Sequence, residues 1–253
     1  MVHFVGAGPG AVDLITVRGL QLLKEADQVI YAGSLVNPEL LQACREDCRI
    51  LNSASMTLEE IVSAIEAAEA EGLDTVRLHT GDPSVFGAIG EQMDRLDALG
   101  IAYDVIPGVS SFCAAAAALP AEYTVPGRSQ TVILTRMPGR TPVPEGERMA
   151  DLARHRASMA VFLSAGLLRE LTEELLTAGW PEDAPAAIVY KASWPDEKVL
   201  RCSIAELADA AGREGIRSTA LVLLGEFLSD RRARSLLYDP EFTHGYRSGG
   251  ERS

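Results

Sequence analysis

Aromatic side chains are scarce, at 6% of the 253 residues, so a folded core must come from aliphatic side chains and alanine. Cysteine is also rare. The spacing of Cys44, Cys48, Cys113 and Cys202 matches no common zinc or redox motif. We therefore expect reduced thiols and no metal site. A chain of this length buries enough surface to fold without disulfides or metals.

Positive charge is in deficit, with 23 Lys and Arg against 36 Asp and Glu, a formal net charge of −13. Such a field repels phosphate backbones and anionic lipid, which argues against nucleic-acid and membrane partners. The longest apolar run, residues 112–119, is too short to span a bilayer. The chain opens directly on a strand-like run without a secretion signal, so we expect a cytoplasmic protein.

Short apolar runs alternate with longer helical patterns, which predicts an α/β fold with a largely parallel sheet. Strands are expected at residues 2–5, 29–32, 75–79, 102–106, 131–135, 159–163, 187–190 and 219–224. Helices are expected at residues 16–26, 37–41, 57–72, 86–99, 110–118, 167–178 and 204–211. Prolines and a glycine in residues 120–128 break this rhythm. We therefore predict α/β domains at residues 1–122 and 123–245, followed by a flexible tail at 246–253.

A glycine-rich segment, Gly-Ala-Gly-Pro-Gly-Ala at residues 6–11, follows the first expected strand. Its spacing satisfies the dinucleotide-binding fingerprint. However, the next helix start signal comes only at Thr16, and the second strand ends without the acidic residue that binds a ribose. An NAD(P)-dependent oxidoreductase is thus disfavoured but kept as an alternative. The segment is either a tight turn with positive φ or a ligand-facing loop.

Two further loops follow expected strands: His-Thr-Gly-Asp-Pro-Ser-Val-Phe-Gly at residues 79–87 and Ile-Pro-Gly-Val-Ser-Ser at residues 106–111. Gly81 would let a ligand approach the backbone, and Asp82 would accept hydrogen bonds, although Gly-Asp-Pro alone is an ordinary turn. The serines lack the final glycine of a nucleophile elbow, which excludes a hydrolase. No Walker lysine is present and the histidines are scattered, so phosphoryl transfer and metal hydrolysis lack their residues.

In this order and spacing, the three loops resemble those of the tetrapyrrole (corrin/porphyrin) methylases, and the resemblance runs from residue 2 to about 245. Segments 31–36, 122–126, 135–142 and 190–195 resemble the precorrin-4 C11-methyltransferase branch of cobalamin synthesis. The resemblance implies two α/β domains with a cleft between them, S-adenosylmethionine bound in that cleft, a homodimer, and precorrin-4 as substrate. Whether the macrocycle contains cobalt, as in the anaerobic route, stays open.

Other interpretations also remain. One is a sibling enzyme, such as another precorrin methylase, a uroporphyrinogen-III methylase or diphthine synthase. Another is a ligand-binding or scaffold protein without catalysis.

Transferred position by position, the resemblance implies cofactor contacts at Gly8, Pro9, Gly10, Thr80, Gly81, Asp82, Val85, Phe86, Ser110, Ser111, Leu163, Ala192 and Ala220. Thr80 and Leu163 depart from the family pattern, which commonly has glycine and methionine there. Methyl transfer is an in-line displacement that needs alignment more than acid–base chemistry. The hypothesis is that a pyrrolic ring of the substrate supplies the electron pair that attacks the methyl group. The sequence identifies no catalytic residue.

The expected substrate carries many carboxylates, whereas the protein is itself acidic. Local positive charge must therefore override the global field. Arg128, Arg136, Arg140 and Lys191 lie in loops predicted to face the cleft, and arginine binds carboxylates in bidentate fashion. We predict these four residues as substrate contacts; the competing interpretation, for at least half of them, is a solvated surface charge.

Overall fold

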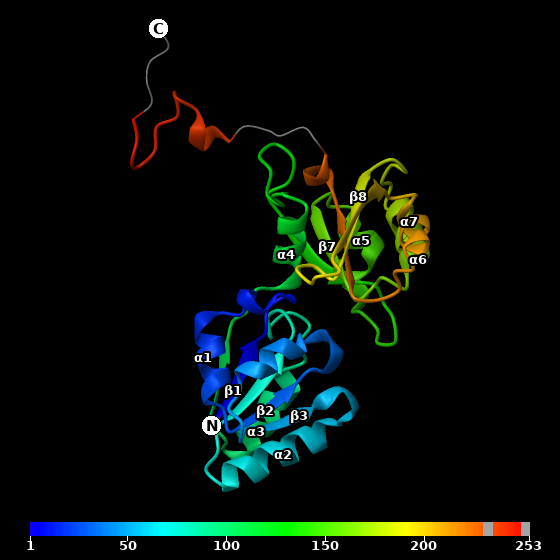
Figure 1. Ribbon diagram of the computed structural model, residues 1–253. Helices are drawn as coiled ribbons and strands as arrows, with labels where there is room; N and C mark the ends of the chain where they lie inside the picture. Colours follow the sequence, from blue (N-terminus) through cyan, green and yellow to red (C-terminus); the bar gives the residue numbers. More distant parts are fainter. Residues whose placement is uncertain (230–234, 249–253) are drawn as a thin grey trace. The chain divides into compact units, whose positions relative to one another are not determined.

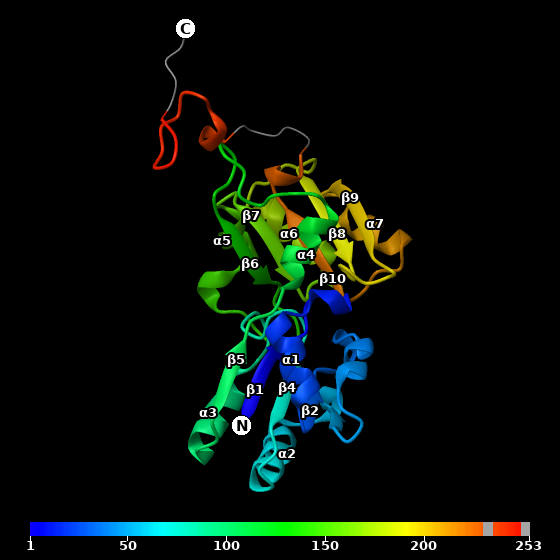
Figure 2. The ribbon, with the colours of Figure 1, turned by 60° about the vertical axis from the view of Figure 1, so that its left-hand side comes forward.

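The computed structural model describes residues 1–229 and 235–248 (Figures 1 and 2). It divides into two compact units. The N-terminal unit comprises residues 1–115 together with 191–197, and the C-terminal unit comprises residues 116–190 and 198–253. Among the described residues, no helix is long and apolar enough to cross a membrane. Residues 249–253 of the expected tail lie outside the described part, and the predicted domain limits stay a prediction.

The N-terminal unit is built on a five-stranded sheet in the order β3-β2-β4-β1-β5, in which every pairing is parallel. The strands are β1 (Val2–Gly6), β2 (Gln28–Tyr31), β3 (Arg49–Asn52), β4 (Thr75–His79) and β5 (Tyr103–Ile106). The parallel sheet predicted from the sequence is confirmed here. The order differs from the 3-2-1 arrangement of dinucleotide-binding domains, because β4 lies between β2 and β1. The strands that precede the three glycine-bearing loops are therefore neighbours.

Helices cover both faces of this sheet. Helices α2 (Leu58–Ala70) and α3 (Gly90–Leu99) lie on one face (Figure 1). Their side chains form one core with Phe4 and Ile30. Helix α1 (Val17–Glu25) and the 3-10 helix η3 (Pro38–Ala43) form the other with Val5 and Val29. The remaining 3-10 helices of this unit are η1 (Val12–Leu14), η2 (Gly33–Leu35) and η4 (Ser53–Ser55). Successive strand side chains point to opposite faces, which divides the core in two.

Local signals account for most helix boundaries. Thr16 caps α1 by accepting from the Gly19 amide, and Thr57 with Glu60 forms the expected capping box of α2. The prediction that a helix begins at residue 86 is wrong for the first turn, since α3 begins only at Gly90. Phe86 and Ala88 have φ of 56° and 49°, which a right-handed helix excludes. Strand β3 was not predicted, because it is largely exposed and lacks an apolar face.

The C-terminal unit contains a five-stranded sheet in the order β6-β7-β10-β8-β9. Its strands are β6 (Val132–Arg136), β7 (Ser158–Phe162), β8 (Pro185–Tyr190), β9 (Lys198–Ser203) and β10 (Ala220–Leu224). Only β6 and β7 pair in parallel, and the other three pairings are antiparallel. The expectation of a largely parallel sheet is wrong for this unit. The short connection 191–197 between β8 and β9 leaves no room for the crossover that a parallel pair requires.

Helices α5 (Met149–Ala153), α6 (Leu168–Thr177) and α7 (Leu207–Arg213) pack on one face of this sheet (Figure 2). Their core includes Met159, Leu171, Ile188 and Val222, all fully buried. Helix α5 and strand β9 were not predicted, and α7 begins later than expected. Helix α4 spans Ser111–Ala118, and the 3-10 helices η5, η6 and η7 span Glu145–Glu147, Glu226–Leu228 and Leu236–Tyr238.

Candidate cofactor and substrate sites

The loops after β1, β4 and β5 meet at the carboxyl edge of the N-terminal sheet. The Gly81 amide donates to the Gly8 carbonyl at 2.8 Å, and the Gly8 amide donates to the Gly81 carbonyl at 3.2 Å. These bonds form a small antiparallel bridge between the first two loops. Motifs that are separate in sequence thus form one cluster of main chain at the edge where parallel α/β sheets bind ligands.

Close approach explains why glycine occupies these positions. A Cβ on Gly6 would lie 2.5 Å from the Gly108 Cα, and one on Gly108 would lie 2.1 Å from the Gly81 carbonyl oxygen. Both contacts are with backbone atoms, so no side chain can move aside. Gly8 and Gly81 also adopt φ of +80° and +61°. The glycines therefore serve loop packing as well as any ligand, and the positive-φ interpretation is confirmed for Gly8.

Asp82 joins the second loop to the third. Its Oδ2 accepts from the Gly108 amide at 2.8 Å, and its Oδ1 accepts from the Ser84 amide at 2.8 Å and from the Ser84 hydroxyl. Burial raises the pKa of this carboxyl, but the hydrogen bonds from Ser84 and Gly108 outweigh it and leave the pKa below its ordinary value. An anionic carboxylate is thus fixed at the edge of the loop cluster.

The segment 191–197 packs onto the first loop within the N-terminal unit. Trp194 Nε1 donates to the Pro9 carbonyl at 3.0 Å, and a Cβ on Gly10 would lie 2.1 Å from the indole ring. The Ala11 amide donates to Ser193 Oγ at 3.0 Å. The sequence analysis predicted Lys191 as a substrate contact and Ala192 as a cofactor contact, but it did not predict the contacts of Ser193 and Trp194 with the first loop. A tryptophan in an otherwise polar stretch was the available signal.

The other predicted cofactor residues of this unit surround the same cluster. Ser110 and Ala192 are buried, Thr80, Val85 and Ser111 are half-buried, and Phe86 is exposed. In the C-terminal unit, Ala220 begins β10 and is buried, whereas Leu163 follows β7 with 68% of its surface exposed and φ of 53°. An exposed leucine in a left-handed conformation has no explanation in packing, and such strain concentrates at functional loops. The assignment of these residues to a cofactor stays a prediction.

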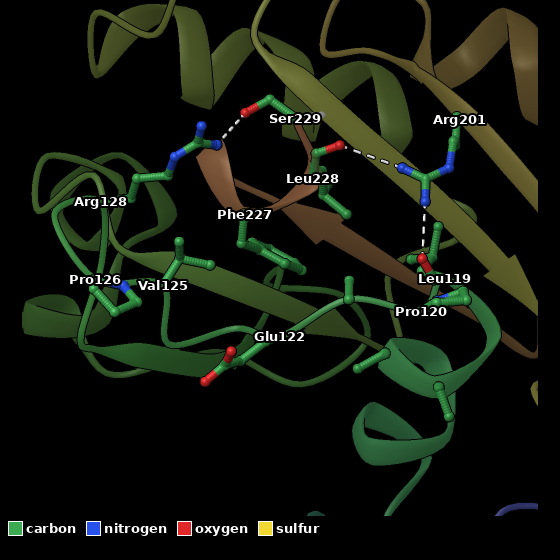
Figure 3. A pocket seen from close by; sticks show the side chains of 13 residues that line it. Leu119, Pro120, Glu122, Val125, Pro126, Arg128, Arg201, Phe227, Leu228 and Ser229 are labelled. Atoms are coloured by element: carbon green, nitrogen blue, oxygen red, sulfur yellow. Dashed lines mark hydrogen bonds between the residues drawn. The ribbon is translucent and has the colours of Figure 1, made fainter. Parts of the chain in front are cut away.

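The C-terminal unit contains a pocket of about 690 Å³ (Figure 3). Arg128 lies on one side of it and donates to the Ser229 hydroxyl and the Glu226 carbonyl. Arg201 lies on another side and donates to the carbonyl of Leu119 at 2.9 Å and to that of Leu228 at 3.3 Å. These hydrogen bonds fix two guanidinium groups in the lining of the same pocket. The rest of the lining is formed by Ala116, Ala117, Pro120, Ala121, Glu122, Val125, Pro126 and Phe227.

Arg201 was missed because strand β9, which carries it, was not predicted. The remaining predicted substrate contacts do not line this pocket. Arg136 donates to the carbonyls of Thr141 at 3.1 Å and Pro142 at 2.7 Å, so it orders its own loop. Arg140 is exposed in that loop. Lys191 belongs to the N-terminal unit, pairs with Asp196 at 2.6 Å and lies 5.5 Å from the centroid of the Trp194 ring.

The pKa values of all four cysteine thiols are raised above the ordinary value. The four cysteines are free in this structure. Burial, and secondarily the neighbouring Cys48, raises the pKa of the Cys44 thiol to about 11, and burial does the same for Cys202. No group of three His, Cys, Asp or Glu side chains gathers as a metal site within residues 1–229 and 235–248.

A parallel sheet with linked glycine loops, together with a mixed sheet whose pocket is lined by two arginines, defines an α/β protein with two candidate ligand sites. The family model of the Tetrapyrrole (Corrin/Porphyrin) Methylases matches residues 1–208. The chain belongs to this family.

Individual relatives support this family membership. The chain is 49% identical over 247 residues to a cobalt-precorrin-4 C(11)-methyltransferase from Methanocaldococcus jannaschii, covering 97% of this chain and 95% of the relative. It is 45% identical over 249 residues to a precorrin-4 C(11)-methyltransferase from Pseudomonas aeruginosa, covering 98% and 99%.

Solved structures of tetrapyrrole methyltransferases also match the chain. A crystal structure of a cobalt precorrin-4 methyltransferase matches with a TM-score of 0.88 at 49% identity, covering 90% of this chain and 95% of that one. A uroporphyrin-III C-methyltransferase from Thermus thermophilus, complexed with S-adenosylhomocysteine, matches with a TM-score of 0.73 at 28% identity, covering 90% and 92%. These matches confirm the predicted α/β class and the resemblance stated from the sequence.

Proposed function

We propose that this protein is an S-adenosylmethionine-dependent methyltransferase that methylates C11 of precorrin-4 in cobalamin biosynthesis. The observation that carries the proposal is near full-length identity of 45–49% to enzymes named for that reaction. The linked loops after β1, β4 and β5 support it, because several of the residues that we expect to contact the cofactor, such as Gly8, Gly81 and Asp82, belong to them. The alternatives of the oxidoreductase class lose support through the strand order of the N-terminal sheet.

The residues of the N-terminal unit fit a sulfonium cofactor. S-adenosylmethionine supplies a methyl group activated by its positive sulfur, so the protein needs neither a metal nor an acid for the leaving group. Asp82, held anionic by its hydrogen bonds, stabilises positive charge on a bound cofactor. The loops, tied together by hydrogen bonds between Gly8 and Gly81, would fix the orientation of the methyl donor, which an in-line displacement requires.

The pocket of the C-terminal unit fits an anionic substrate. Arg128 and Arg201 place two positive groups at different sides of the pocket, while the molecule as a whole has a net charge of −13. Local charge near a pocket dominates over distant charge because ionic interactions between exposed groups are screened within about 10 Å. The proposal also includes a cytoplasmic location and a homodimeric assembly. Light scattering at micromolar concentration measures the molar mass in solution and so tests the assembly.

The reaction itself is tested by isotope mapping. The purified protein is incubated with precorrin-4 and methyl-labelled S-adenosylmethionine, with and without inserted cobalt, and the product is analysed by carbon NMR. The proposal predicts label at C11. Label at another carbon identifies a sibling methylase, and no transfer to any tetrapyrrole contradicts the proposal. Comparing the two forms of the macrocycle distinguishes the aerobic from the anaerobic substrate.

A further inference from the structure

A second pocket, of about 330 Å³, lies in the N-terminal unit on the side of the sheet covered by α2 and α3. It is lined by apolar residues such as Met56 and Ile61 and by the polar side chains of Arg77, His79 and Gln92. Neither Arg77 nor His79 has a role in the proposed chemistry. Both belong to β4, two residues apart, so their side chains point to the same face of the sheet.

Arg77 is a buried cation that has no counter-ion among the described residues. Its side chain donates from Nε to Gln92 Oε1 and from Nη1 to the Ile30 carbonyl, each at 3.0 Å, and these acceptors are neutral. It is only 5% exposed, and within the described part of the chain it forms no ion pair with a carboxylate. A buried charge left unpaired is costly, so such a guanidinium normally has an anionic partner.

His79 is the second unusual group of this pocket. It is 4% exposed, and its Nε2 is buried with no hydrogen-bond partner in residues 1–229 and 235–248. Burial, together with the positive charge of Arg77, lowers the pKa of His79 to about 3, so the imidazole is neutral at physiological pH. Buried polar atoms of proteins are nearly always hydrogen-bonded, and an exception calls for a missing partner.

We propose that Arg77 and His79 form a subsite for one carboxylate group, which enters the pocket between α2, α3 and the loop 85–88. The guanidinium supplies the positive charge, and the imidazole Nε2 supplies an N–H donor. The pocket is large enough for a carboxymethyl or carboxyethyl group with its first atoms, at the small end of ligand sites. Because Thr80, Val85 and Phe86 line the same pocket, the subsite borders the loops expected to hold the cofactor.

The carboxylate could be a side chain of the tetrapyrrole, a free small acid or the amino-acid end of the cofactor. Only the first and third of these rest on the proposed function. The subsite is therefore tested first with sodium propionate on the full-length protein labelled with ¹⁵N-histidine. The sequence has four histidines, and the ring signals that His79→Phe removes identify His79.

We expect propionate to shift the His79 ring resonances saturably, whereas propionamide, its neutral isostere, leaves them unchanged. His79→Phe should weaken propionate binding, measured by titration calorimetry, by about tenfold or more, since a hydrogen bond to a charged group is lost. Glu59→Gln is the matched control, because Glu59 is an exposed acid on α2 and does not line the pocket. This control should leave propionate affinity unchanged.

Further probes identify the source of the carboxylate. Competition between propionate and uroporphyrin III, an octacarboxylate tetrapyrrole, assigns the subsite to the substrate. Competition with S-adenosylhomocysteine but not with 5′-methylthioadenosine, which lacks the carboxylate, assigns it to the cofactor, and no competition assigns it to a free acid. The proposal is overturned if none of these carboxylates shifts the His79 signals. A lack of methyl transfer with intact propionate binding contradicts only the proposed reaction.

Discussion

Single residues decide how closely the three loops approach, and Gly108 is the most constrained of them. Gly108→Ala would place a methyl group 2.1 Å from the Gly81 carbonyl oxygen. We expect a loss of about 1–3 kcal/mol in the free energy of unfolding, as is typical of overpacking, with weaker S-adenosylhomocysteine binding. Urea denaturation and calorimetry measure the two effects. Gly212→Ala, in α7 with nothing near its Cβ, is the control and should be neutral or stabilising.

Asp82→Asn isolates the charge of the carboxylate that joins the loops. We expect a loss of about 1–3 kcal/mol in the free energy of unfolding at pH 7, because charge-assisted hydrogen bonds to Gly108 and Ser84 are weakened. Since the pKa of Asp82 is lowered in the folded state, its contribution is complete above the ordinary carboxyl pKa of about 4 and is lost as pH falls through the folded value.

The difference between wild type and Asp82→Asn should therefore be constant from pH 6 to 8 and shrink below about pH 4. Urea denaturation across this range measures it. Asp13→Asn, an exposed acid of the same unit, should show no such dependence. A difference between wild type and Asp82→Asn that grows on acidification would contradict the assigned role.

At the scale of elements, the segment 191–197 is the least expected contributor to the loop cluster. It follows β8 in the chain, yet Trp194 and Ser193 hold the first glycine loop of the N-terminal unit. Lys191 and Ser193 have φ of 46° and 69°, so the segment adopts a conformation that its own sequence does not favour. The contacts with the loop must supply the free energy that maintains it.

Trp194→Phe removes the hydrogen bond to the Pro9 carbonyl and keeps a ring near Gly10. We expect S-adenosylhomocysteine to bind about two- to tenfold more weakly, the equivalent of one neutral hydrogen bond. Titration calorimetry measures the affinity. Pro195→Ala changes an exposed neighbour and should bind normally. Unchanged affinity in Trp194→Phe would show that this contact does not organise the loop for the cofactor.

At the scale of the whole molecule, the net charge of −13 opposes an anionic substrate, so arginines must create local attraction. Arg128 and Arg136 differ in how their guanidinium groups are used. Arg128 lines the large pocket, whereas Arg136 binds the carbonyls of its own loop. We therefore expect Arg128 to contribute more to substrate binding than Arg136.

Arg128→Ala should raise the KM for the tetrapyrrole about tenfold with little change in the affinity for S-adenosylhomocysteine, as expected for one charge-assisted contact. Arg136→Ala should have a smaller effect. Steady-state kinetics at low and high salt measure both, and the KM of the wild type should rise with salt because screening weakens the attraction. Arg154→Ala, which breaks an exposed ion pair with Asp151, is the control. The carboxylate-binding role is refuted if Arg128→Ala and Arg136→Ala both leave KM unchanged.

Patterns along the sequence were sufficient to predict the parallel N-terminal sheet, the caps at Thr16 and Thr57, and the family, because cap residues, the alternation of strand and helix patterns, and the order of three glycine loops can all be recognised without strand order. The structure was needed to show that β4, β1 and β5 are neighbours, and hence that the three loops form one cluster. It also decided the antiparallel pairing of the second sheet, the position of Trp194 against Gly10, and the buried pair of Arg77 and His79. These features join residues far apart in the chain, and strand order and burial follow from the packing of the whole unit rather than from any local pattern.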